Sequence, residues 1–156
     1  MSYKVFISYS TKDLSIVEDI KRVLTKPEVE VFIAEDAISP GNRLNDTIVD
    51  EIKNCDMFVL LWTRNSKSSE YVQQEIGIAR GNNKTIFPIV LETGLQLPAF
   101  IKELKYLKAY GTTDEIAESL KRFQKNIFSR SEKQQLTNAL VLLVLGVVLL
   151  WLLSQK

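Results

Sequence analysis

Six consecutive apolar residues, Met57–Trp62 (MFVLLW), restrict the fold of this chain more than any other segment. A strand that is apolar at every position buries both of its faces, which is typical of a parallel sheet covered by helices on both sides. Thr85–Val90 has the same character. Between such strands the apolar residues recur at helical spacing, as in Asp13–Leu24 (DLSIVEDIKRVL). This alternation predicts an α/β domain.

The residue ranges of the individual elements follow from the same patterns. We expect strands at 4–9, 28–33, 57–62, 85–90 and a weaker, edge-like strand at 104–110, with helices at 13–24, 44–53, 69–80 and 113–128. Thr11 or Asp13 is suited to cap the first helix, and Ser68 or Ser69 the third. The order of elements predicts a flavodoxin-like, five-stranded parallel sheet with helices on both faces.

The C-terminal segment differs in composition from the rest of the chain. No charged residue lies between Lys133 and Lys156, and Ala139–Leu153 is unbroken apolar sequence. A helix over Leu136–Leu153 would be roughly 27 Å long at about 1.5 Å per residue, close to the hydrocarbon core of a bilayer at about 30 Å. Apolar side chains occur on every face of this helix rather than on one stripe. We therefore expect a single C-terminal transmembrane helix at 136–153, as a tail anchor.

Basic residues on either side of this segment predict its orientation. Only Lys156 follows it, whereas Lys121, Arg122, Lys125, Arg130 and Lys133 precede it. The positive-inside rule then places the folded domain on the cytoplasmic side of a single-pass membrane protein. The alternative is a helix buried in an oligomeric bundle.

Composition limits the chemistry that the domain can perform. The chain has no histidine and one cysteine, Cys55, which excludes Ser-His and Cys-His nucleophilic catalysis, an intrachain disulfide and a cysteine-based zinc site. Its formal net charge of +1 indicates no basic face, so nucleic acid is not an expected partner. Cys55 precedes an apolar strand and is expected to be an inert buried thiol. Residues 1–128 suffice for one domain with its own core, followed by a polar linker at 129–135.

Function in a parallel sheet is located at the carboxyl ends of the strands, where the loops converge. The segments after the first and third strands read SYSTKD and WTRNSK, and neither is expected to bring a carboxylate close to a strand end. This excludes a phosphoacceptor receiver domain, which needs acidic residues there. The first loop lacks the glycine of a flavin mononucleotide site, and the chain has neither a dinucleotide fingerprint nor a P-loop. No metal site or bound cofactor is expected.

Three segments and a strand together resemble the Toll/interleukin-1 receptor (TIR) domain family, including its prokaryotic-type enzymatic branch. VFISYSTKD (Val5–Asp13) is similar to the opening box of the family. VFIAEDAISPGNRLNDTIVDEIKNCD (Val31–Asp56) resembles its second strand, loop and second helix, and SEYVQQEIGIA (Ser69–Ala79) resembles the pattern Ser-x-Trp-Val-x-x-Glu-Ile of the enzymatic branch. With IFPIV (Ile86–Val90), the resemblance spans nearly all of 3–128.

The resemblance implies a catalytic role for Glu75, because the enzymatic branch cleaves NAD+ with a glutamate at this position. Tyr71 stands where that branch has a tryptophan, one helical turn earlier, and would form an aromatic wall of the site. A single carboxylate is sufficient for this reaction because nicotinamide leaves as a neutral molecule and needs no proton. The alternatives are a solvated surface position for Glu75 and a packing role for Tyr71.

Further substrate-binding residues are implied by the same resemblance. Tyr9 and Ser10 match a ligand-contacting loop, although helix capping is an equal alternative for this segment. Asp36 would add polarity to the site or only solvate its loop, and Arg43 would meet a phosphate or a neighbouring domain. Ala34 departs from the acidic or aromatic residue that many relatives carry there.

The expected function is a membrane-tethered NAD+ nucleosidase that acts in immune or defence signalling when TIR domains self-associate. Its product would be ADP-ribose or cyclic ADP-ribose, with NAD+ as substrate rather than cofactor. Pro40 and Gly41 are expected to shape the loop that contacts the next TIR domain. The alternative is a non-catalytic TIR adaptor that clusters at a membrane and acts through TIR–TIR interactions.

Overall fold

The computed structural model describes residues 2–34, 46–112, 114–115, 118 and 132–155. In this part of the chain, five parallel strands form one sheet in the order β2-β1-β3-β4-β5. The strands are β1 (Tyr3–Ser8), β2 (Val29–Ile33), β3 (Met57–Trp62), β4 (Ile86–Val90) and β5 (Leu107–Lys108). The helices are α1 (Leu14–Leu24), α2 (Asp46–Asn54), α3 (Arg64–Lys67), α4 (Glu70–Gly81) and α6 (Glu132–Ser154), with short 3-10 turns η1 (Thr11–Asp13) and η2 (Ala99–Ile101). The predicted five-stranded parallel α/β fold is confirmed.

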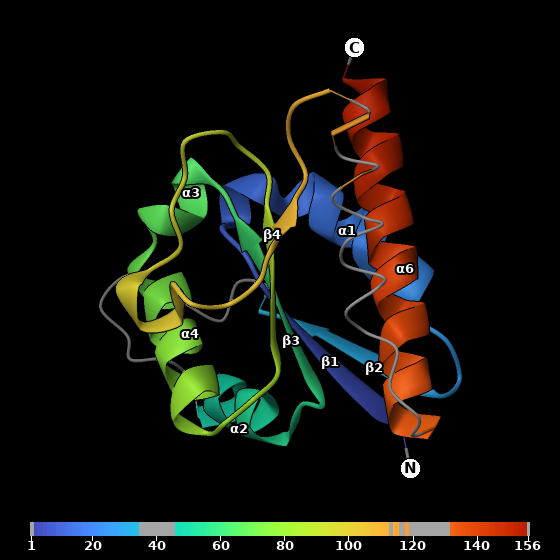
Figure 1. Ribbon diagram of the computed structural model, residues 1–156. Helices are drawn as coiled ribbons and strands as arrows, with labels where there is room; N and C mark the ends of the chain where they lie inside the picture. The colour runs from blue at the N-terminus through green and yellow to red at the C-terminus, as the bar shows by residue number, and fades with distance from the viewer. Residues whose placement is uncertain (1, 35–45, 113, 116–117, 119–131, 156) are drawn as a thin grey trace.

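Helices cover both faces of the sheet, with α1 and α6 on one face and α2 and α4 on the other (Figure 1). Strand β1 divides its side chains between the faces because successive residues of a strand point in opposite directions. Val5 and Ile7 pack under α1 and α6, whereas Phe6 faces α2 and α4. The ring of Phe6 lies 5.4 Å from the rings of both Phe32 and Phe58, which forms an aromatic row across β2, β1 and β3.

Most of the expected element boundaries agree with the structure to within two residues. β3 has the predicted bounds and all of its residues are buried. Ser69 caps α4, since its side chain accepts a hydrogen bond from the backbone N–H of Val72. The weak strand expected at 104–110 is reduced to the short β5, and the short helix α3 was not predicted. The helix expected at 113–128 lies mostly outside the described residues.

The C-terminal helix α6 packs along its own domain (Figure 1). It begins at Glu132, inside the stretch expected to be a linker. The buried side of α6 faces α1 and the sheet and consists of Leu140, Val141, Val144, Leu145 and Val148. A 2.5 Å hydrogen bond between Tyr3 Oη and Thr137 Oγ1 joins β1 to the first part of the helix. Neither alternative drawn from the sequence had placed this helix against its own sheet.

The other side of α6 is apolar and exposed. Leu142 is 45% exposed and Leu150 is 69% exposed. The segment Gln135–Ser154 is long and apolar enough to cross a membrane, with a mean hydropathy of 2.6, and 28% of that window is buried within the domain. Membrane spans and core helices of soluble proteins share this length and composition.

Candidate active site

Buried polar side chains gather at the carboxyl edge of the sheet, where β1 and β3 end. The described residues contain the following buried polar or charged side chains: Ser8, Ser10, Thr63, Ser66 and Glu75. Ser8 ends β1, and Thr63 directly follows β3. Burial of a polar group is unfavourable unless the group is hydrogen bonded. No buried side-chain nitrogen or oxygen of the described residues lacks a hydrogen-bond partner, so this edge carries a connected polar network inside an otherwise apolar domain.

Glu75 is the buried carboxyl group of this edge, and it is only 3% exposed. It lies on the inward face of α4 together with Val72, Ile76 and Ala79, so it interrupts an otherwise apolar stripe. Ser8 Oγ donates a 2.5 Å hydrogen bond to Glu75 Oε2. The side chain thus points at the end of β1 rather than into solvent, and the alternative of a solvated surface glutamate is excluded.

Burial changes the acid–base behaviour of Glu75. Loss of hydration disfavours the charged form and raises the pKa of this carboxyl from 4.5 to about 7, while the hydrogen bond from Ser8 acts in the opposite direction. At neutral pH the group is therefore divided between its protonated and ionised forms. A carboxyl whose pKa is moved by burial and held by one specific donor is a candidate for catalysis.

Ser8 is a site residue that the sequence analysis missed. It is fully buried and is the donor to Glu75. The alternation of side chains along β1 could have revealed it. Ser8 lies two positions after Phe6, so both side chains point to the face of the sheet that α4 covers. A hydroxyl on the inward face at the last residue of a buried strand implies a polar partner on the covering helix.

The other residues that the resemblance implied have different positions. Tyr71 lies one helical turn before Glu75 on α4 and is half-buried, and its expected role as an aromatic wall stays a prediction. Ala34, just after β2, packs against the cluster formed with α2 and α4. Asp36 and Arg43 lie outside the described residues, and their expected roles stay predictions.

Tyr9 and Ser10 follow Ser8 but do not share its environment. Tyr9 is 7% exposed and packs in the core cluster under α1 and α6, whereas Glu75 lies on α4, which covers the opposite face. Ser10 Oγ accepts a hydrogen bond from the backbone N–H of Lys12 and so caps η1. The structure thus gives Ser10 the capping contact that the sequence analysis held as an equal alternative.

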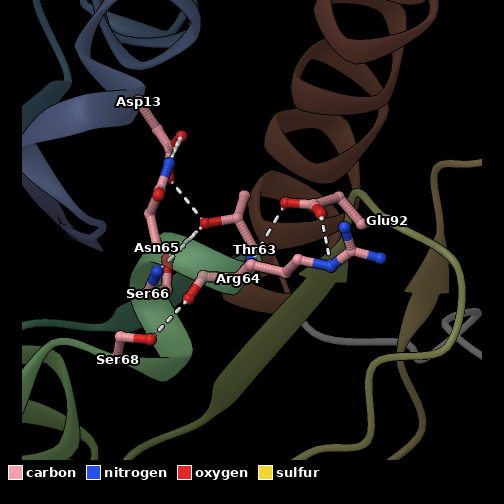
Figure 2. Close-up of polar contacts among 7 residues, drawn as sticks. All are labelled: Asp13, Thr63, Arg64, Asn65, Ser66, Ser68 and Glu92. Carbon is pink, nitrogen blue, oxygen red and sulfur yellow. Dashed lines mark hydrogen bonds and ion pairs between the residues drawn. The ribbon is translucent and has the colours of Figure 1, made fainter.

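Asp13 does not cap α1 through its side chain but reaches across to the end of β3 (Figure 2). Its Oδ2 accepts a 2.7 Å hydrogen bond from Thr63 Oγ1, and its Oδ1 accepts a 3.0 Å bond from Asn65 Nδ2. The expectation that no carboxylate would lie near these strand ends was therefore wrong. The turn η1 brings Asp13 back over the sheet, which residue spacing alone did not reveal.

Other groups at the edge are structural. The backbone N–H of Arg64 donates to Glu92 Oε1, and the guanidinium lies 3.4 Å from Oε2, so α3 is tied to the second residue after β4 (Figure 2). In the described part of the chain no group of three or more His, Cys, Asp or Glu side chains is placed to hold a metal ion. Cys55 is buried and its thiol donates to the Ile52 carbonyl, and burial raises its pKa to about 11, as expected for an inert thiol.

Solved structures of other proteins share this fold. The TIR domain of the Toll-related receptor TRR-2 from Hydra magnipapillata is 19% identical with a TM-score of 0.57, covering 80% of this chain and 98% of that one. The CMP N-glycosidase BcmB of Clostridium botulinum is 20% identical with a TM-score of 0.53, covering 76% and 98%. A prokaryotic SEFIR domain is 23% identical with a TM-score of 0.53, covering 82% and 100%. At these identities the similarity establishes the fold alone.

Sequence comparison supplies the family. No curated protein matches the chain. The family described as TIR domain matches residues 5–123, which include most of β1, all of β2 to β5 and the helix that carries Glu75. A family match over most of a chain, with the family's fold present in the structure, identifies its membership. This chain belongs to the TIR domain family.

Proposed function

We propose that this protein is a membrane-tethered NAD+ nucleosidase that cleaves the nicotinamide–ribose bond and acts when its TIR domains self-associate. The observation that carries the proposal is the enclosed carboxyl group of Glu75, 3% exposed and held by Ser8 at the carboxyl edge of the sheet. The product would be ADP-ribose or cyclic ADP-ribose, in a defence or immune signalling role.

The reaction needs little from the protein beyond a well-placed negative charge. In NAD+ the nicotinamide nitrogen is a cationic pyridinium, so the C1′–N bond breaks with its electron pair moving to nitrogen and nicotinamide departs neutral. Positive charge then develops on the ribose as an oxocarbenium ion. A carboxylate in a site with little water stabilises that charge more strongly than one in bulk solvent. Water or an adenine nitrogen then bonds to C1′ and releases a proton, which gives the linear or the cyclic product.

The similarity to the Clostridium botulinum N-glycosidase supports the class of bond. That protein is named for cleavage of the N-glycosidic bond of CMP, and its fold matches this chain over 98% of its own length. A sugar–nitrogen bond to a nitrogenous base is the bond that NAD+ presents at nicotinamide. A fold shared with this chain therefore accommodates N-glycoside cleavage in that protein.

Ionisation of Glu75 is expected to control the reaction. Only the carboxylate form stabilises an oxocarbenium ion, and the pKa of about 7 places its formation in the physiological range. The Ser8 hydroxyl donates a hydrogen bond to this carboxyl and favours its ionised form. Activity is therefore expected to rise with pH through about 7.

Tethering by α6 would favour the assembled form. TIR domains generally self-associate, and confinement to a membrane raises the effective concentration of one domain around another. The exposed apolar side of α6 and the mean hydropathy of 2.6 support such an anchor. The predicted orientation, with the domain on the cytoplasmic side, gives the site access to cellular NAD+.

The test follows NAD+ loss and product formation with the full-length chain in vesicles at increasing protein density. We expect turnover that rises with density and falls at least about 100-fold in Glu75→Gln. Glu70→Gln is the matched control, because Glu70 is an exposed residue of the same helix. Equal turnover in Glu75→Gln and Glu70→Gln would refute the assignment.

The second candidate is a TIR adaptor that recruits partners without chemistry. Tyr71 in place of tryptophan favours it, as does the Ser8–Glu75 hydrogen bond, which would satisfy both groups in a purely structural role. An adaptor leaves NAD+ intact at every density and still self-associates in cross-linking experiments. Pro40→Ala and Gly41→Ala are then expected to weaken self-association, and unchanged cross-linking in both variants would count against this candidate.

A further inference from the structure

We infer that Asp13 and Asn65 are positioning residues that hold Ser8 and Glu75 in register across the carboxyl edge of the sheet. The inference rests on the proposed function of Glu75. We use the name Asp13 clamp for the hydrogen-bonded unit of Asp13, Thr63 and Asn65 (Figure 2). Its two side-chain hydrogen bonds join the loop after β1 to the loop after β3.

The clamp uses both oxygens of one carboxylate. Asp13 Oδ2 accepts from Thr63 Oγ1 at 2.7 Å and Oδ1 accepts from Asn65 Nδ2 at 3.0 Å. Thr63 Oγ1 also accepts from the backbone N–H of Ser66 at 3.0 Å and so caps α3. Ser66 Oγ donates in turn to the Leu61 carbonyl at 2.6 Å. Asp13 is therefore bonded to the start of α3, which is itself held to β3 by the hydrogen bond from Ser66 to Leu61.

The two joined segments lead directly to the two partners of the candidate site. Ser8 is five positions before Asp13 in the chain, at the end of β1. On the other side, the backbone N–H of Ser69 bonds to the last part of α3, and Ser69 caps α4, which carries Glu75. Ser8 itself is held by the pairing of β1 with β3. Displacement of the loop after β3 would carry the start of α4 with it and move Glu75 away from Ser8.

A capping role does not account for Asp13. Residues at this position of a helix ordinarily direct a side-chain oxygen to the first backbone N–H groups, but Asp13 makes no such bond to α1. Ser10 caps the preceding turn instead. Both oxygens of Asp13 are directed to the neighbouring loop, which indicates a role between segments rather than within one.

The test exchanges the donor and acceptor. Asn65→Asp places a second carboxylate against that of Asp13, and the two charges repel at this distance. The double variant Asp13→Asn/Asn65→Asp restores an amide donor opposite a carboxylate acceptor and leaves an amide oxygen to accept from Thr63. Full-length wild type, both single variants and the double variant are compared in the same vesicles. Asn83→Asp, in the exposed turn after α4, controls for the added charge.

We expect Asn65→Asp to lower kcat/KM for NAD+ by about 100-fold, the size of effect caused by an error of about 1 Å in position. The double variant returns it to within about threefold of wild type, as expected for directly coupled residues. The pH midpoint of kcat moves upward in Asn65→Asp, because loss of the Ser8 bond removes the contact that favours the carboxylate. The midpoint returns in the double variant. A loss of activity with an unchanged midpoint, or no recovery in the double variant, would overturn the inference.

A second readout does not depend on NAD+ turnover. For each clamp variant, the difference in Tm from its Glu75→Gln counterpart is measured against pH, which reports the pKa of Glu75 through linkage. The midpoint of that difference shifts upward in Asn65→Asp and recovers in the double variant. If Tm fell equally at every pH and the midpoint of the Tm difference did not shift, the clamp would only stabilise the fold. Absence of NAD+ turnover in wild type would refute the proposed function and still leave this measurement to decide on the clamp.

Discussion

Replacing Glu75 by glutamine changes the charge of the candidate site while keeping the shape of the side chain. Folding raises the pKa of this carboxyl from 4.5 to about 7. Because the folded chain holds this proton more tightly, the contribution of Glu75 to stability is fully present below pH 4.5 and is lost as the pH rises from there through 7. At about 1.4 kcal/mol for each pKa unit, the loss above pH 7 is about 3 kcal/mol. Glutamine is neutral at every pH and avoids this loss.

Glu75→Gln is therefore expected to be more stable than wild type at pH 8 to 9, and the difference should decline toward pH 4.5. For a chain of this size, about 3 kcal/mol corresponds to roughly 6–12 °C in Tm. Thermal unfolding of the full-length chain is followed by circular dichroism in one detergent over this pH range. The new amide N–H groups add an offset that does not depend on pH, so the change with pH is the quantity to compare.

Glu70→Gln serves again as the control, since an exposed carboxyl on the same helix contributes little to the pH dependence. Agreement would also mean that the proposed enzyme gives up stability to keep this carboxyl enclosed, which is typical of functional groups. A Tm difference between Glu75→Gln and wild type that is constant from pH 4.5 to 9 would show that burial does not raise the pKa of Glu75.

Other expected outcomes concern the neighbours of the site, the C-terminal helix and the thiol. Ser8→Ala removes the hydrogen bond to Glu75 and should raise the pH midpoint of NAD+ cleavage in a pH–rate profile; a midpoint at or below that of wild type would contradict this. Leu140→Ala, at 1% exposure, should lower the free energy of unfolding by about 2–5 kcal/mol in urea titrations without detergent, while Leu150→Ala, at 69% exposure, should change it by less than about 0.5 kcal/mol. Equal effects would contradict the docked position of α6. Cys55 should resist thiol reagents at pH 8 until the chain unfolds, because its pKa is raised to about 11; rapid labelling of folded protein would show that the thiol is accessible.

The elements that could be predicted are those with an unambiguous apolar pattern. Met57–Trp62 is apolar at every position and too short for a typical helix, and it forms β3 with the predicted bounds. The strand expected at 104–110 shrinks to two residues, since mixed charge and apolar character on an edge leaves pairing to tertiary context. Helix α3 was missed because four residues are too few to show a helical period.

The candidate site divides in the same way. The resemblance to the TIR family singled out Glu75, but no pattern in the sequence showed that its carboxyl is enclosed or that Ser8 is the donor. The contact between Asp13 and Thr63 spans 50 positions in the chain, and it depends on a turn whose direction is set by packing. Local spacing predicts which residues share a face of one element, whereas contacts between loops require the assembled sheet.

The position of α6 has a consequence for how lipid would act on this protein. Leu140 and Val144 cannot be in contact with acyl chains while they cover α1 and the sheet. A bilayer therefore competes with the domain for the same side chains. Insertion of α6 into the bilayer would expose the part of the hydrophobic core that the helix covers. Most ligands raise the melting temperature of the protein that binds them. For this chain, vesicles should instead lower the melting temperature of the domain in proportion to the helix they extract.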